Sequence, residues 1–144
     1  MKSVAEDVAT YLAAQMTGWT LGTNVMAGIL TDLPDTQIAV LDAPGLPRLR
    51  MQSAAHSDTL KPGCQVRVRC KGGAGAYQSG YAIAKVVETT LRAANNVTWN
   101  SGTAHQTFYG AFFQRGAILS LGQDDETRSE FSLSYVVVRS DDVR

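Results

Sequence analysis

The sequence predicts an α+β fold in which two helices pack on one face of a mostly antiparallel β-sheet. Two segments repeat apolar residues at the helical period, and several others alternate apolar and polar residues as strands do. They follow one another in the order helix, strands, helix, strands, which is typical of α+β sandwiches. The chain has 144 residues, 44% of them hydrophobic. This length suits a single domain spanning residues 1–144.

The first helix is expected from Val4 to Met16. Ser3 and Glu6 form a capping-box pattern at its start, in which each residue satisfies a free backbone N–H of the other. Apolar residues then recur at helical spacing, and Gly18 ends the helix. Residues 24–30 fit a short strand less clearly.

Residues 36–41 predict a buried strand that follows a turn at residues 32–35. The next stretch, residues 42–62, contains three of the four prolines, so we expect a long loop with a short extended piece near residues 49–52. A loop of this length in a compact domain is usually functional or mobile.

Residues 64–70 alternate cleanly and predict a strand with one face on the core. The residues expected on the core face are Cys64, Val66, Val68 and Cys70, and those expected to face outward are Gln65, Arg67 and Arg69. The two cysteines then lie roughly 20 Å apart along one strand. They can neither pair with each other nor share a metal ion, and we expect reduced thiols.

A second helix is expected from Ala76 to Ala94, with polar residues away from one apolar stripe. The stripe consists of Tyr77, Tyr81, Ala84, Val87 and Leu91, and the residues away from it are Lys85, Glu88 and Arg92. Strands are then expected at residues 97–99, 106–114, 117–121 and 129–139 as an antiparallel meander. Phe131, Leu133, Tyr135 and Val137 should share one face of the last strand.

Charge is balanced overall but uneven along the chain. Thirteen basic and thirteen acidic residues give a net charge of zero. Residues 45–71 contain six basic residues and one acidic residue, whereas residues 1–42 and 124–144 are acidic. Such a pattern can steer one subunit onto another or onto a partner, although scattered surface charge explains it equally well. The charged fraction of 18% is below the usual value of about 25%, as expected if a partner covers much of the surface.

The glycine-rich stretch at residues 70–80 lies between a strand and a helix, where phosphate-binding loops occur. A nucleoside-triphosphate loop needs a lysine at the position of Tyr81, and a dinucleotide loop needs a glycine at the position of Gln78. A simple strand-to-helix turn is therefore favoured over a phosphate site, and no cofactor is expected.

No set of residues predicts catalysis. Neither His56 nor His105 has a second histidine or a cysteine at ligand spacing, so no metal site is expected. The Gly-x-Ser-x-Gly elbow of hydrolases is missing, and the acidic residues 124–126 suit a solvated turn. We expect no catalytic residue and no enzyme activity. No apolar run is long enough to span a membrane, and no secretion signal is visible.

A row of basic residues is the best candidate for a contact surface. Arg67 and Arg69 should lie on one strand face with Gln65, and Arg48 and Arg50 can extend the row. A nucleic-acid backbone would suit such charge. No aromatic residues interleave with the arginines, so base stacking is not expected, and salt bridges to an acidic protein neighbour are favoured over contact with a nucleic-acid backbone. The residues expected to contact another subunit or partner are Arg48, Arg50, Gln65, Arg67 and Arg69.

Four stretches, taken in order, carry a resemblance to a known family. They are TDLPDTQIAVLDAPGLPRL, KPGCQVRVRCKGGAGAYQSGYAIAKVVETTL, NVTWNSG and EFSLSYVVV. Their order and spacing resemble the minor capsid or tail terminator proteins of long-tailed bacteriophages, over about residues 1–138. The family shares a Leu-Pro-Asp turn before a strand, here Leu33-Pro34-Asp35, and a Pro-Gly-x-Gln-Val-x-Val-Arg strand, here residues 62–69. The glycine-rich entry to the second helix departs from the family, where a more polar, acidic turn is expected.

The resemblance implies a structural virion protein, made in the host cytoplasm and located in the tail or neck. It implies a homohexameric ring at the head-proximal end of the tail tube, which stops tube polymerisation and joins the tail to the head-tail connector or stopper protein. It also implies that the ring contacts the tail tube protein and that DNA passes through the lumen without specific binding. The alternatives are another neck or tail component, such as a connector or a tube subunit, or a small enzyme that binds a phosphate ligand.

Overall fold

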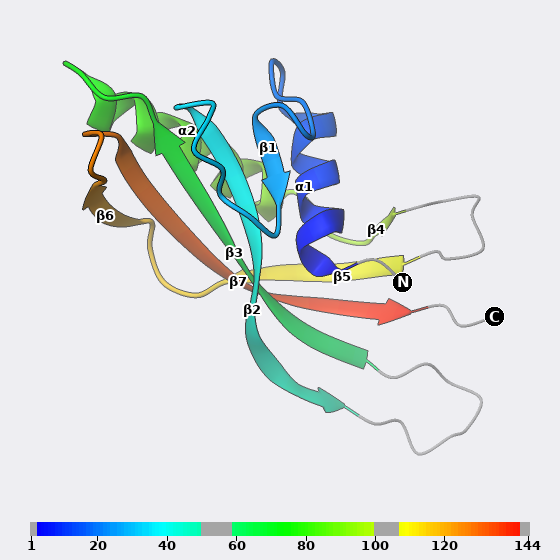
Figure 1. Cartoon of the computed structure of the whole chain (residues 1–144). Helices are drawn as coiled ribbons and strands as arrows, with labels where there is room; N and C mark the ends of the chain where they lie inside the picture. Colours follow the sequence, from blue (N-terminus) through cyan, green and yellow to red (C-terminus); the bar gives the residue numbers. More distant parts are fainter. Residues whose placement is uncertain (1–2, 50–58, 100–106, 142–144) are drawn as a thin grey trace.

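The fold is α+β, as the sequence predicts. The computed structural model describes residues 3–49, 59–99 and 107–141 (Figure 1). The elements, in chain order, are α1 (Val4–Gln15), β1 (Val25–Ala27), β2 (Gln37–Leu49), β3 (Thr59–Cys70), α2 (Ala76–Arg92), β4 (Val97–Trp99), β5 (Thr107–Gln114), β6 (Leu119–Gln123) and β7 (Ser129–Asp141). Within these ranges, neither helix is long and apolar enough to cross a membrane.

The seven strands form one sheet with the last strand near its centre. The strand order is β1-β2-β3-β7-β5-β4, and β6 also pairs with β7. β1 runs parallel to β2, and the other pairs are antiparallel. The predicted meander of the last four strands is therefore wrong, because β5 pairs with β7 and not with β6. Since β3 occupies one edge of β7, β5 and β6 lie end to end along the other edge.

Both helices pack on one face of the twisted sheet (Figure 1). α1 covers β1, β2 and β3, and α2 covers β3 and β7. The core forms between them from the alternate residues of the central strands. As predicted, Cys64, Val66 and Val68 of β3 and Phe131, Leu133, Tyr135 and Val137 of β7 are all buried there.

The start of α1 is fixed by two polar contacts. The predicted capping box is present: the Glu6 amide donates to the Ser3 hydroxyl, and the Ser3 amide donates to the Glu6 carboxylate. One turn further on, the hydroxyl of Tyr109 donates to the carboxylate of Asp7 at 2.5 Å, and both side chains are buried. Burial, followed by the bond to Asp7, raises the pKa of Tyr109. The phenol therefore stays protonated and ties α1 to β5.

The buried face of α2 contains Ala84, Val87 and Leu91 of the predicted stripe but not its two tyrosines. Tyr77 and Tyr81 are 54% and 38% exposed, whereas Gly80 is buried. A Cβ atom at Gly80 would lie 2.6 Å from the Phe131 ring, so glycine is what lets the helix approach the sheet. The two tyrosine rings instead pack edge-on against Phe131, with centroids 5.2 and 6.1 Å away.

Glu88 is also buried, although the sequence predicts it to lie away from the core. Its carboxylate accepts hydrogen bonds from the Gln114 amide at 2.8 Å and from the Lys85 ammonium at 3.0 Å. These two bonds lower the pKa of Glu88 from its ordinary value of 4.5. A charged carboxylate is therefore part of the contact between α2 and β5.

The Glu88 contact predicts a pH dependence. Because the folded-state pKa is lowered, the ionised carboxylate stabilises the fold above about pH 4.5 and loses this effect as the pH falls through the folded-state value. We expect Glu88→Gln to be less stable than wild type at pH 7 and the difference to shrink below pH 4.5. Urea unfolding at several pH values measures this. Asp125→Asn, which removes one charge from an exposed turn, is the control; equal pH curves for Glu88→Gln and wild type would contradict the expectation.

Residues 42–62 are mostly strand, so the predicted loop is wrong over the part that the structure describes. β2 continues to Leu49 and β3 begins at Thr59; the rest of the predicted loop, including Arg50 and the extended piece after Leu49, lies outside the described residues. Register shifts between Ala43 and Leu49 accommodate the prolines. Prolines and glycines suggest a loop in sequence, but at irregular positions they are compatible with a strand. The result is a long hairpin that extends beyond the helices (Figure 1).

Both cysteines are free thiols buried on β3, as predicted. Burial, with a smaller effect of the Asp42 charge, raises the pKa of Cys64 to about 12. The thiolate is the reactive form, so Cys64 should be inert in the folded protein. We expect native protein at pH 8 to leave Cys64 unmodified by iodoacetamide, and urea-unfolded protein to be modified at both cysteines, as peptide mass spectrometry can measure. Rapid modification of Cys64 in native protein would contradict its burial.

Candidate subunit-contact surfaces

The predicted row of polar residues on β3 does lie on the sheet face opposite the helices, but its members have different environments. Gln65 is partly buried and donates to the hydroxyl of Ser132 at 2.7 Å. Arg67 is partly buried, and its Nε has no hydrogen-bond partner within the described part of the chain. Gln65 also lines a hollow of about 450 Å³ together with Arg115 and Ser134.

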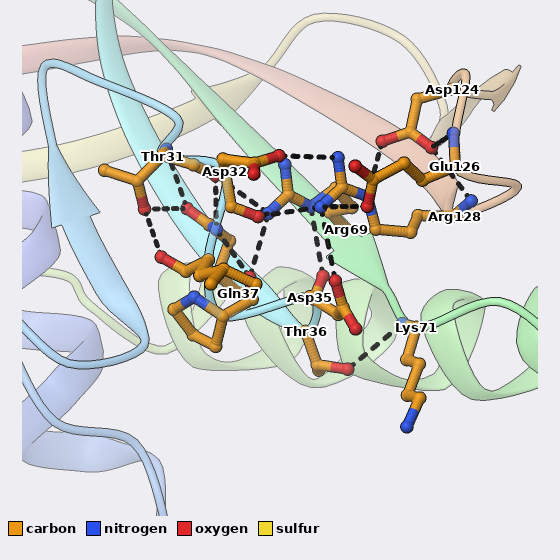
Figure 2. A network of polar contacts seen from close by, with 12 residues as sticks. Thr31, Asp32, Asp35, Thr36, Gln37, Arg69, Lys71, Asp124, Glu126 and Arg128 are labelled. Carbon is orange, nitrogen blue, oxygen red and sulfur yellow. Dashed lines mark hydrogen bonds and ion pairs between the residues drawn. The ribbon is translucent and has the colours of Figure 1, made fainter.

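Arg69 does not face solvent, and this part of the prediction is wrong. It is 3% exposed because the turn at residues 31–35 folds over it (Figure 2). Its guanidinium donates to the backbone carbonyls of Asp35 at 3.0 Å and of Thr31, Asp32 and Pro34 at 2.8 Å each. Arg69 therefore holds the turn on the sheet.

A second buried arginine, Arg128, supports the same turn from the other side (Figure 2). It donates to the carbonyl of Asp32 at 2.7 Å and pairs with the carboxylates of Asp32 and Asp35 at 3.3 Å. Its Nε also donates to Asp124 at 2.6 Å, and Glu126 lies 3.4 Å away. Arg128 follows an acidic turn in the sequence, a local signal for a charge cluster that the sequence analysis missed.

Of the two remaining predicted contact residues, only Arg48 lies in the described part of the chain. Arg48 belongs to β2, and Arg50 lies outside the described residues. The structure therefore does not assemble the five predicted residues into one row. A contact role for Arg48, Arg50, Gln65, Arg67 and Arg69 stays a prediction.

The glycine-rich stretch forms the turn that the sequence favours. Gly73 and Gly75 have positive φ angles of 124° and 78°, which suit glycine. A Cβ atom at Gly72 would lie 2.7 Å from the carbonyl oxygen of Thr127, and Gly80 packs on Phe131. Backbone geometry and packing thus account for four of these glycines. In the described ranges no group of His, Cys, Asp and Glu residues could hold a metal ion; His56 and His105 lie outside them.

At the edge of the sheet formed by β1, an apolar hollow lies between α1 and β1; we name it the β1 groove. Its volume is about 340 Å³. It is lined by Glu6, Thr10, Leu21, Gly22, Val25, Met26, Ala27 and Ile29. Leu21 and Ile29 are 47% and 59% exposed, so large apolar side chains meet solvent at this groove.

A second exposed apolar surface lies far from this groove, at β6; we name it the β6 surface and define it by Leu119 and Leu121. All five residues of β6 are exposed, and Leu119 is 60% exposed. Ser120 pairs with Phe131 and so shares the helix face with Tyr77 and Tyr81, whereas Leu119 pairs with Ser132 and lies on the opposite face of the sheet. The sequence analysis missed both apolar surfaces, because alternation alone does not show which strand edges are left uncovered.

Comparison with known proteins identifies the family. A family model described as bacteriophage tail terminator protein matches residues 11–140, which is most of the chain. No curated protein matches the chain at a significant level. The match covers every element from the second half of α1 to β7. It confirms the resemblance on which the sequence analysis relied, and the chain belongs to the bacteriophage tail terminator family.

Proposed function

We propose that this phage tail protein assembles into a closed ring at the head-proximal end of the tail tube. The ring stops tube polymerisation and joins the tail to the head-tail connector. The family match over residues 11–140 carries the proposal, because it makes the chain a structural component of the virion. Ring size, tube termination and head joining go beyond that match.

The surfaces of the subunit support a ring. A closed ring with one subunit type needs two different, mutually complementary surfaces on each subunit. The β1 groove and the β6 surface are apolar, exposed and unlike each other, and they lie toward opposite sides of the sheet. A monomeric protein rarely leaves large contiguous apolar patches exposed, so such patches mark interaction sites.

The long β2–β3 hairpin supports contact with a further partner. It continues beyond the part of the sheet that the helices cover (Figure 1). β2 contains Arg48, and much of the hairpin belongs to the basic region at residues 45–71. We propose this hairpin as the element that reaches the tail tube protein or the connector. The chain as a whole has no net charge, which suits a conduit that lets DNA pass without holding it.

Electron microscopy of tails tests the proposal. In tails made without the protein, tube length should be uncontrolled, and adding purified protein should place one ring at the head-proximal end. Light scattering on the purified chain, alone and with tail tubes, should give a closed oligomer, with six subunits expected. Open-ended cylinders grown from the chain alone would identify a tube subunit instead. Purified tails that lack the protein would overturn the proposal.

A further inference from the structure

We propose that, before it joins a tail, the protein forms a symmetric pair in which the open edges of β6 from two copies meet as antiparallel strands. The occupant of this edge is a second copy of the same chain, and Ser120 lies at the two-fold axis. The inference goes beyond the proposed function, because a symmetric pair does not close a ring. The pair covers the β6 surface, so it must open before that surface can serve in a ring.

The first observation is the open edge of β6. This strand pairs with β7 on one side, and in the described ranges no strand lies on its other side (Figure 1). All five of its residues are exposed. An exposed edge strand invites pairing with another chain, and natural proteins usually protect such an edge with charge or proline. β6 contains neither, so its outer edge is available to a further strand.

The second observation fixes the length and centre of the pair. The register between β6 and β7 shifts between Ser120 and Gly122, so Leu121 is the extra residue of a β-bulge, at which the strand bends. The bend limits further pairing to a short stretch. With the centre of the pair at Ser120, Leu119 of each copy lies opposite Leu121 of the other. These leucines are 60% and 39% exposed in the single chain, and the pair covers them.

The third observation is the charge at the two ends of β6. Arg115 lies five residues before Ser120, and Asp125 lies five residues after it. Both side chains are exposed, and neither has an ion-pair partner in the part of the chain that the structure describes. A basic residue therefore precedes the uncharged strand and an acidic residue follows it.

This order of charges makes β6 complementary to itself in one direction only. Antiparallel strands bring the start of one copy to the end of the other, so Arg115 of each copy approaches Asp125 of the other. A parallel pair would place Arg115 beside Arg115 and Asp125 beside Asp125. The neighbouring acids contribute less, because Asp124 and Glu126 already pair with Arg128 at 2.6 and 3.4 Å. Charge thus selects the antiparallel arrangement.

Light scattering tests whether the pair forms. Two short strands bury far less than the roughly 1,600 Å² of a standard protein interface, so the dimer should be weak and should depend on concentration. With rising concentration of the purified chain, the mean mass should increase from monomer to dimer before any ring forms.

A disulfide tests the position of the two-fold axis. Directly opposite residues of antiparallel strands lie about 4.5–5.5 Å apart, a separation that a disulfide can bridge. The native thiols are buried, so only an introduced surface cysteine should react. Ser120→Cys should therefore give covalent dimers on oxidation without any second variant. Leu46→Cys is the control, at a leucine that is 51% exposed on the β2–β3 hairpin, and should give none.

Charge reversal tests the direction of the pair. Arg115→Glu and Asp125→Arg should each weaken dimerisation about tenfold, because each places like charges together at both ends of the pair. An equimolar mixture of the two variants should dimerise like wild type, because opposite charges then meet again at both ends. The mixture is the control for unspecific effects, since it contains the same substitutions. Thermal unfolding of each variant in dilute solution should match wild type, because both positions are exposed.

The outcomes separate this inference from the proposed function. If the chain stays monomeric or passes directly to a ring, and Ser120→Cys gives no covalent dimer, the inference is wrong. A dimer that resists both charge reversals and gives no Ser120→Cys disulfide uses another surface, which would also overturn the inference. Tails that carry no ring at the head-proximal end would overturn the proposed function, whether or not the free protein pairs.

Discussion

Arg69→Met should destabilise the protein by about 3 kcal/mol, one of the two largest effects expected of a single substitution here. The guanidinium donates to four backbone carbonyls of residues 31–35, and methionine can donate to none. Gln37 also donates to the carbonyls of Thr31 and Pro34, and Arg128 also donates to the carbonyl of Asp32. The loss of stability is therefore smaller than the sum over four hydrogen bonds. The carbonyl of Asp35 depends most on Arg69 for its hydrogen bond.

Arg67→Met is a matched control, because it makes the same change on the same face of the same strand. Arg67 is only partly buried, and its substitution should change the free energy of unfolding by less than about 1 kcal/mol. Urea unfolding at one protein concentration measures the free energy of unfolding of both variants, and in thermal unfolding the Arg69 variant should melt roughly 10 °C below wild type. Equal midpoints for the two variants would show that the turn does not depend on Arg69.

Gly63→Ala should destabilise the hairpin by about 2–3 kcal/mol. Gly63 pairs with Ala43, and a Cβ atom there would lie 2.3 Å from the carbonyl oxygen of Pro44 and 2.8 Å from that of Ala43. Gly45 approaches the other strand just as closely, with an ideal Cβ atom 2.1 Å from the carbonyl oxygen of Lys61. Both obstacles are backbone atoms, so the strands must separate locally to admit even a methyl group.

Gly110→Ala provides the comparison for Gly63→Ala. Gly110 lies in β5, and an added Cβ atom would meet Val138 at 3.8 Å, an ordinary contact. This variant should be as stable as wild type or slightly more stable, because alanine lowers the entropy of the unfolded chain. Hydrogen exchange should show faster exchange of the amides around Leu41 and Gln65 in Gly63→Ala and not in Gly110→Ala. Unchanged exchange in Gly63→Ala would mean that the hairpin tolerates the methyl group.

Local signals in the sequence predict much of the fold. The capping box at Ser3 and Glu6 places the start of α1, and the alternation at residues 64–70 places the core face of β3. Helical periodicity places the end of α2 within two residues and predicts three of its buried residues, Ala84, Val87 and Leu91, but it wrongly predicts that Tyr77 and Tyr81 are buried. The apolar pattern favours burial of the two tyrosines. Because α2 approaches Phe131 closely at Gly80, the helix face that carries this glycine packs on the sheet instead.

The features that the sequence did not reveal depend on contacts between distant segments. Arg69 is buried by a turn more than thirty residues earlier in the chain, and no local pattern indicates that cover. Strands adjacent in sequence usually pair, which favours a meander, yet β5 pairs with β7 and not with β6. For the candidate contacts, alternation predicted the face on which Gln65 and Arg67 lie. The exposed leucines of β6 are recognisable only once the sheet order shows an open edge.

The central position of β7 has a consequence for synthesis of the protein. On the ribosome, β1, β2 and β3 emerge first, then β4, β5 and β6, and β7 emerges last. β7 is the strand that lies between β3 and β5. Until it is made, β1-β2-β3 and β4-β5 are two separate parts of the sheet. A nascent or truncated chain that ends before Ser129 therefore lacks both the finished core and the strand that supports β6. Only copies translated through β7 should be competent to enter a virion.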